Sequence, residues 1–204
     1  MKWILWREYR LNRWILATGA ALLVLSYVLA ALIIFFSGSE HDPGGGFTVM
    51  FSILIIALLA GNSFAGERVD RSAEFVVSLP LERSRLLAGK LILCLGTVVV
   101  LGIANSLMLD QPNPLAIRSN AFFELVLFTS ATLLCFSVSW CLSAVQPSPA
   151  LATSSGLIVA ILTVTTGVRE FTSAERGWLV AAILTIAIAC FCFGTRHFLR
   201  RSEP

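Results

Sequence analysis

The amino-acid sequence predicts an all-α integral membrane protein with six transmembrane helices, both termini in the cytoplasm and an N-terminal interfacial amphipathic helix. Of its 204 residues, 57% are hydrophobic and 13% are charged, whereas soluble domains are about 45–50% apolar and about 25% charged. The apolar residues also gather in six runs of about the 20 residues that a helix needs to cross a bilayer core. We therefore expect one six-helix transmembrane domain over residues 1–204.

The six runs show no alternation typical of strands, and helices satisfy their own backbone hydrogen bonds in lipid. They are Trp14–Phe36, Phe47–Ala65, Leu91–Leu109, Ala121–Val145, Ala150–Val168 and Trp178–Gly194. Basic residues precede the first run, as in a cleavable signal peptide. However, its 23 residues exceed the apolar region of about 7 to 15 residues found in signal peptides, so we expect it to remain as a membrane helix.

Residues 1–13 are too charged to cross the membrane and are predicted to lie on its inner surface. Ile4, Leu11, Trp3 and Trp14 fall within one helical sector, although Arg7 interrupts this apolar stripe. We interpret the segment as an imperfect amphipathic helix that turns into the first crossing. A frayed basic tail is the alternative.

Basic residues collect in the segments that share a side with the N-terminus. With a cytoplasmic N-terminus, twelve Lys and Arg residues lie inside and three, Arg118, Arg169 and Arg176, lie outside. Cytoplasmic loops carry such an excess, so both termini are predicted to be cytoplasmic in the inner cell membrane. The basic residues stand between apolar runs and not on a soluble face, which argues against nucleic acid as a partner.

The sequence offers no pattern for a cofactor, a metal ion or catalysis. All five cysteines lie inside apolar runs: Cys94, Cys135, Cys141, Cys190 and Cys192. They are interpreted as small buried residues, because no further ligand stands at metal-site spacing. The glycines of Gly61–Gly66 have the spacing of a phosphate-binding loop, but Glu67 and Arg68 follow where such a loop has Lys and Ser or Thr. We expect no cofactor and no enzymatic activity in this chain. Deep helical positions also lack the acidic and histidine chains of ion-driven transporters.

The fifth run carries small residues at four-residue spacing, namely Ala152, Gly156 and Ala160. Small residues allow transmembrane helices to approach closely. Ordinary packing within the membrane domain is one interpretation, and a contact with another subunit is the other.

Residues 66–90 form the one long cytoplasmic segment, and they contain a helical pattern of their own. Ser72 is a plausible N-cap, Phe75, Val76 and Leu79 share one face, and Pro80 ends the helix. Such a short amphipathic helix suits either the membrane surface or a protein partner.

This segment resembles the permease subunits of ABC-2 type transporters. The family's features appear as Glu67 at the end of the second run, a short helix with the turn Leu79-Pro80-Leu81-Glu82-Arg83, and Gly89-Lys90 opening the third helix. The N-terminal Trp6-Arg7-Glu8 and Arg10 are similar to the family's interfacial elbow, which would correspond to residues 1–13.

The resemblance implies a permease, in most of the family an exporter, that binds separate ABC ATPase subunits and a second copy or a related permease. Residues 66–90 would then act as a coupling helix seated on the ATPase. The residues implied in that contact are Glu67, Arg68, Glu74, Phe75, Val76, Leu79, Pro80, Leu81 and Arg83. In the family the first and fifth helices meet across the dimer, which would give Ala152, Gly156 and Ala160 a role. The alternative function is a non-transporting membrane anchor or assembly factor that recruits a soluble partner.

Overall fold

The structure, a computed structural model, describes residues 2–37, 44–69, 83–109, 121–167 and 173–200. These residues form the helices α1 (Lys2–Ser37), α2 (Gly44–Val69), α4 (Arg83–Leu109), α5 (Ala121–Val145), α6 (Pro149–Gly167) and α7 (Ser173–Arg200). Each of the six is long and apolar enough to cross a membrane. The prediction of an all-helical protein with six membrane-spanning helices is therefore confirmed.

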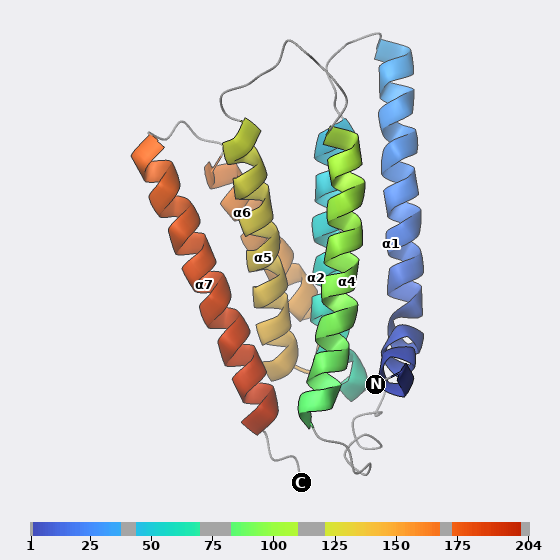
Figure 1. Ribbon diagram of the computed structural model, residues 1–204, viewed down its shortest axis with the longest axis vertical. Coiled ribbons are helices and arrows are strands. Elements are labelled where there is room, and N and C mark those ends of the chain that lie inside the picture. Colours follow the sequence, from blue (N-terminus) through green and yellow to red (C-terminus); the bar gives the residue numbers. More distant parts are fainter. Residues whose placement is uncertain (1, 38–43, 70–82, 110–120, 168–172, 201–204) are drawn as a thin grey trace.

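The six helices stand side by side in one bundle (Figure 1). α1 begins and α7 ends at the same end of the bundle, which we call the termini end. At this end α2 ends and α4 begins, and residues 146–148 connect α5 to α6. The helix ends that flank the segment predicted as cytoplasmic thus lie on the same side as the start of α1 and the end of α7, as an even number of crossings requires. Its assignment to the cytoplasm stays a prediction.

Most helices extend beyond the apolar runs that predicted them, because charged residues continue the helical hydrogen bonding past the hydrophobic stretch. α5 has the predicted bounds, whereas α7 adds a turn or more at each end. Its first turn carries Glu175 and its last turn His197 and Arg200. Acidic residues near a helix N-terminus and basic residues near its C-terminus stabilise the helix dipole.

α2 lies in the middle of the bundle and packs against α1, α4, α5 and α6. Over half of its membrane span, 56%, is buried, compared with 17% for the spans of α1 and α7. Where α2 meets α5 and α7, the buried ring of Trp140 packs against the ring of Phe64, with the ring centroids 4.6 Å apart. Trp140 Nε1 also donates a hydrogen bond to Thr195 Oγ1 on α7. α2 therefore connects α1 and α4 to α5 and α6.

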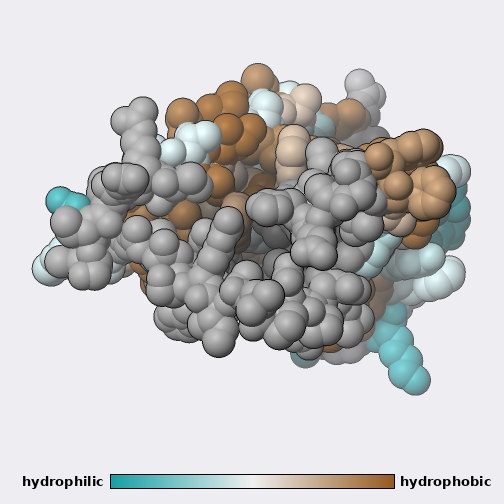
Figure 2. Space-filling view, turned by 90° about the horizontal axis from the view of Figure 1, so that it is seen from above, coloured by the Kyte–Doolittle hydropathy of each residue, from teal (hydrophilic) through white to brown (hydrophobic). Residues whose placement is uncertain are grey.

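The outward faces of the helices are apolar. Figure 2, viewed along the bundle from the end opposite the termini, shows hydrophobic residues over much of the described surface. Large exposed side chains include Val24, Leu32, Val99, Ile158, Leu162 and Ile188. Such a surface suits the lipid that a six-crossing protein contacts.

Residues 2–13 are helical and continue into the first crossing, but their inward face differs from the predicted apolar stripe. The first turns of α1, dark blue in Figure 1, depart from the line of the rest of the helix. Ile4, Glu8 and Asn12 face the protein, whereas Trp3 and Trp14 are exposed. Ile4 thus packs against α4 and not on the surface with Trp3 and Trp14, and the interfacial position of residues 1–13 stays a prediction.

Candidate functional site

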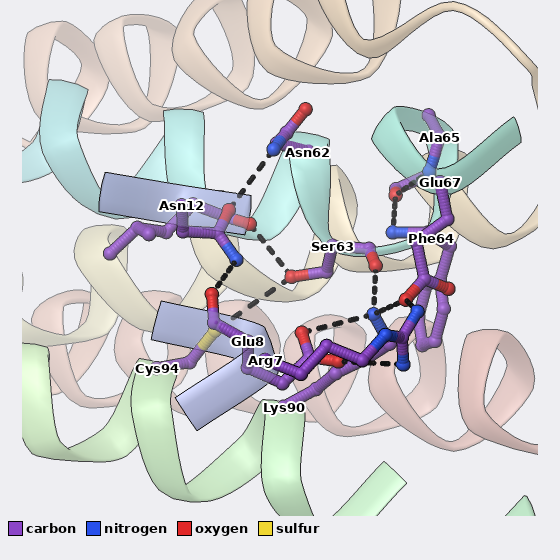
Figure 3. Close-up of polar contacts among 12 residues, drawn as sticks. Arg7, Glu8, Asn12, Asn62, Ser63, Phe64, Ala65, Glu67, Lys90 and Cys94 are labelled. Carbon is purple, nitrogen blue, oxygen red and sulfur yellow. Dashed lines mark hydrogen bonds and ion pairs between the residues drawn. The ribbon is translucent and has the colours of Figure 1, made fainter. Parts of the chain in front are cut away.

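Four charged side chains from three helices meet at the termini end of the bundle (Figure 3). Arg7 and Glu8 belong to α1, Glu67 to the end of α2 and Lys90 to α4. Arg7 Nη2 lies 2.7 Å from Glu67 Oε1, and Lys90 Nζ lies 2.9 Å from the same oxygen. Lys90 Nζ also lies 3.3 Å from Glu8 Oε2, and Arg7 Nη1 lies 3.5 Å from Glu8 Oε1. We call these four residues the charge cluster.

The charge cluster is buried, and its formal charges cancel. The side chains of Glu8 and Lys90 are 1% and 2% exposed, and those of Glu67 and Arg7 are 12% and 14% exposed. Removing charges from water is costly unless each is paired and hydrogen-bonded. Lys90 meets this condition with two carboxylates, a hydrogen bond to the Ser63 carbonyl oxygen at 2.5 Å and the face of the Phe64 ring.

The glycine before Lys90 explains how α1 comes close enough to form the cluster. A Cβ atom at Gly89 would lie 2.6 Å from Ile4 Cγ2, closer than real Cβ atoms come to a neighbour. Glu8 follows Ile4 by one helical turn, so the approach of Ile4 to Gly89 brings Glu8 to Lys90. The Gly-Lys pair noted in the sequence therefore has a structural reason for each residue.

A second layer of hydrogen bonds lies next to the cluster and also joins α1 to α2. Asn62 Nδ2 donates to Asn12 Oδ1 at 3.0 Å, and Asn12 Nδ2 donates to the Glu8 carbonyl oxygen at 3.0 Å. Ser63 Oγ donates to the Leu59 carbonyl oxygen. The cluster is thus continued along the α1–α2 interface by polar side chains (Figure 3).

Arg68 bonds to the other half of the bundle. Its guanidinium donates to the carbonyl oxygens of Ala144 at 2.6 Å and Gln146 at 3.3 Å. The last carbonyl groups of a helix have no partner within the helix, so Arg68 supplies donors at the end of α5. Next to Ala144, Ser143 Oγ accepts hydrogen bonds from the backbone N–H groups of Phe64 and Ala65, which precede Arg68 by about one turn of α2. Consecutive residues Glu67 and Arg68 therefore connect α2 to opposite neighbours.

The described residues include three of the side chains that the resemblance placed at an ATPase contact. Glu67 and Arg68 are the ones just described, and Arg83 begins α4. The other predicted contact residues, Glu74, Phe75, Val76, Leu79, Pro80 and Leu81, lie outside the described residues. The structure therefore describes both ends of the predicted coupling segment, which meet in the charge cluster.

The small residues of α6 pack inside the chain. Ala152 and Ala160 are 0% and 1% exposed. A Cβ atom at Gly156 would meet the Ser139 hydroxyl and lie 2.9 Å from the Cys135 carbonyl oxygen, both on α5. This is the packing alternative of the sequence analysis. None of the three residues is exposed to a second permease copy. A dimer contact through them stays a prediction, and their packing within the chain argues against it.

Sequence reasoning did not identify Arg7, Glu8 and Lys90 as parts of one site. Arg7 gave a signal as the charge that interrupts an apolar stripe, but its partner on α2, Glu67, lies 60 residues away in the chain. Within the described part of the chain, no group of three or more His, Cys, Asp or Glu residues is placed to hold a metal ion. The cluster is instead a set of ion pairs between helices.

One comparison with known proteins identifies a family. Residues 39–175, more than half of the chain, match the model of a family described as ABC-2 family transporter protein. The match runs from just before α2 to the start of α7 and includes Glu67, Arg68 and Lys90. No curated protein and no solved structure matches the chain. A multi-pass membrane chain of six helices that matches this family over two thirds of its length belongs to the ABC-2 transporter family.

Proposed function

We propose that this chain is the permease subunit of an ABC exporter in which a separate ATPase subunit hydrolyses ATP. Membership of the ABC-2 family supports the permease role and association with an ABC ATPase. The chain itself is proposed to bind no nucleotide. Glu67 and Arg68 stand where a phosphate-binding loop has its Lys and Ser or Thr, and both side chains are engaged with neighbouring helices.

The observation that carries the proposal is the ion pair between Glu67 and Lys90, at 2.9 Å. These two residues lie at the two ends of the predicted coupling segment, one on α2 and one on α4. A partner that displaces this segment would act on both helices together, and on α1 through Arg7. Arg68 would extend the displacement to α5. Energy released outside the bilayer would in this way reach four of the six described helices.

In this proposal the predicted coupling segment, residues 66–90, carries the contact with the ATPase. Their apolar residues Phe75, Val76 and Leu79 share one face of the predicted helix, and such a face suits a hydrophobic groove. Glu74, Pro80, Leu81 and Arg83 would complete the contact. Glu67 and Arg68 would anchor it to the membrane helices.

The proposed setting is the inner cell membrane, with the termini end in the cytoplasm. The excess of Lys and Arg in the segments at this end supports that orientation. A second copy of the chain, or a related permease, is the proposed partner within the membrane. Since Ala152, Gly156 and Ala160 are packed inside the chain, this partner would contact other residues of α1 and α6, those that are exposed.

Replacing Phe75 by Asp tests the coupling contact. The change places a charge on the apolar face of the predicted helix, so the ABC ATPase should no longer co-purify with the tagged chain from native membranes. Co-purified ATPase would be quantified by mass spectrometry of its nucleotide-binding peptides. We expect at least a tenfold loss, since about 1.4 kcal/mol of lost binding free energy corresponds to tenfold.

The matched control is Phe75→Leu, which keeps an apolar side chain and should keep the ATPase bound. Both variants should reach the membrane in equal amounts. Undiminished co-purification with Phe75→Asp would contradict the coupling contact. Reconstitution separates a permease from a membrane anchor, because only a permease makes transport, or stimulation of the ATPase, depend on this chain.

A further inference from the structure

The last two turns of α7 line a cavity at the termini end that the charge cluster does not use. Its volume is ≈ 510 Å³, and the described residues that line it are Phe193, Arg196, His197 and Arg200. They stand at positions i, i+3, i+4 and i+7 of the helix, so all four lie on one face. The cavity therefore lies along a single face of α7.

The chemistry of this face suits an anion that carries an apolar part. Two guanidinium groups and an imidazole are present, and none of the described residues that line the cavity is acidic. The rings of Phe193 and His197 stack with centroids 6.2 Å apart. His197 Nδ1 is buried and has no hydrogen-bond partner among the described residues. Basic residues in a last turn also stabilise the helix end, but that effect requires no shared face and no cavity.

The position of the face points to the bilayer as the source of the ligand. α7 lies at the edge of the bundle in Figure 1. Two turns before Phe193 and on the same face of α7, Ile186 is exposed, and Phe193 itself is 58% exposed. Arg196 and Arg200 are exposed at the end of the membrane span, Gly177–Arg200. A molecule with acyl chains along the apolar turns would bring its headgroup to the two arginines.

We propose that this face of α7 binds the phosphate headgroup of an anionic phospholipid. Arginine guanidinium groups bind phosphate through paired, charge-assisted hydrogen bonds. Basic pockets at the ends of transmembrane helices bind the headgroups of anionic lipids. Inorganic phosphate shares the headgroup chemistry, but it has nothing to place against Phe193. The proposal is independent of ATP coupling and of the proposed ATPase contact.

The test measures lipid binding by the full-length chain purified in a neutral detergent. Phosphatidylglycerol, phosphatidylcholine or inorganic phosphate is titrated, and bound molecules are counted by native mass spectrometry. Phosphatidylglycerol should bind in preference to phosphatidylcholine. The double variant Arg196→Gln with Arg200→Gln should bind it about 30-fold more weakly, which corresponds to about 2 kcal/mol. The single variant Arg200→Gln should lose about fivefold and serves if the double variant cannot be purified.

The matched control is Arg10→Gln with Arg13→Gln, which removes the same charge from exposed positions of α1 at the same end. This control should keep the affinity of the unmodified chain. Equal losses in the two double variants would show general attraction to the basic end and would overturn the proposal. Unchanged affinity in the α7 variants, or saturation by inorganic phosphate at the concentrations at which phosphatidylglycerol binds, would overturn it as well.

Discussion

Close backbone approach occurs in both halves of the bundle, at Gly89 and at Gly156, but the first half adds the charge cluster. α1, α2 and α4 meet through the buried ion pairs of the charge cluster, centred on Lys90. α5, α6 and α7 meet through close backbone approach and aromatic rings, as at Gly156 and Trp140. Ion pairs connect particular atoms and can exchange partners, whereas a close-packed interface changes shape only at a steep energetic cost. We therefore expect rearrangement in the first half and rigidity in the second.

The largest expected effect comes from removing the cation at the centre of the cluster. Lys90→Met keeps the length of the side chain but leaves Glu8 and Glu67 with Arg7 as their one partner within the cluster. Breaking a buried pair typically costs about 3–5 kcal/mol, and we expect a loss of stability of that size. The free energy of unfolding would be measured by titrating sodium dodecyl sulfate into the protein in a mild detergent.

Adding Glu8→Gln to Lys90→Met restores a cluster with one cation and one carboxylate. If uncompensated charge causes the loss, the double variant should be more stable than Lys90→Met alone. A double variant that is as unstable as the single one, or less stable, would argue against charge balance as the cause. Arg10→Gln, an exposed change on α1, should stay within about 0.5 kcal/mol of the unmodified chain.

A smaller effect is expected from filling the space between α5 and α6. Gly156→Ala would press a methyl group against the Ser139 hydroxyl and the Cys135 carbonyl oxygen. Overpacking costs about 1–3 kcal/mol, and the same unfolding titration would measure it. Gly96→Ala is the control, because a Cβ atom there meets nothing within 4 Å. A loss of stability in both variants would point to a general effect of alanine and would remove the role of close packing.

The smallest effect is expected beside the charge cluster, where Asn62 joins α2 to α1. Asn62→Ala removes the hydrogen bond to Asn12 Oδ1, and one such bond contributes about 1 kcal/mol. Thr185→Ala is the control, since the Thr185 hydroxyl donates within its own helix, to the Ala181 carbonyl oxygen. Equal stability of the two variants would show that the second layer adds nothing to the α1–α2 contact.

The membrane helices were predictable because their signal is local. Twenty or so consecutive apolar residues are sufficient to predict a crossing, and α5 began and ended at the predicted residues. The ends of α1 and α7 were less predictable, since Arg7 and Arg200 continue a helix beyond its apolar run. Hydropathy places the lipid-exposed part of a helix and carries little information about where its hydrogen bonding stops.

The charge cluster was only partly predictable because its signal is distant in sequence. Glu67 and Arg68 were identified by resemblance to a family, but nothing near Lys90 shows that its carboxylate partners lie on α1 and α2. Arg7 was read as a defect in an apolar stripe, although its guanidinium lies 2.7 Å from Glu67. The side chains of Ala152, Gly156 and Ala160 predicted close packing and left its partner open. One sequence alone contains no record of which distant residues meet.

The charge cluster also bears on the order in which the chain is built. During synthesis Arg7, Glu8 and Glu67 enter with α1 and α2, and Lys90 follows only with α4. Until then, the charge cluster contains two carboxylates and one guanidinium, an imbalance that favours keeping this end of the helices in contact with water. Arrival of α4 completes the set of charges and allows its burial. We therefore expect α1 and α2 to complete their packing at this end only after α4, the third crossing, has been synthesised.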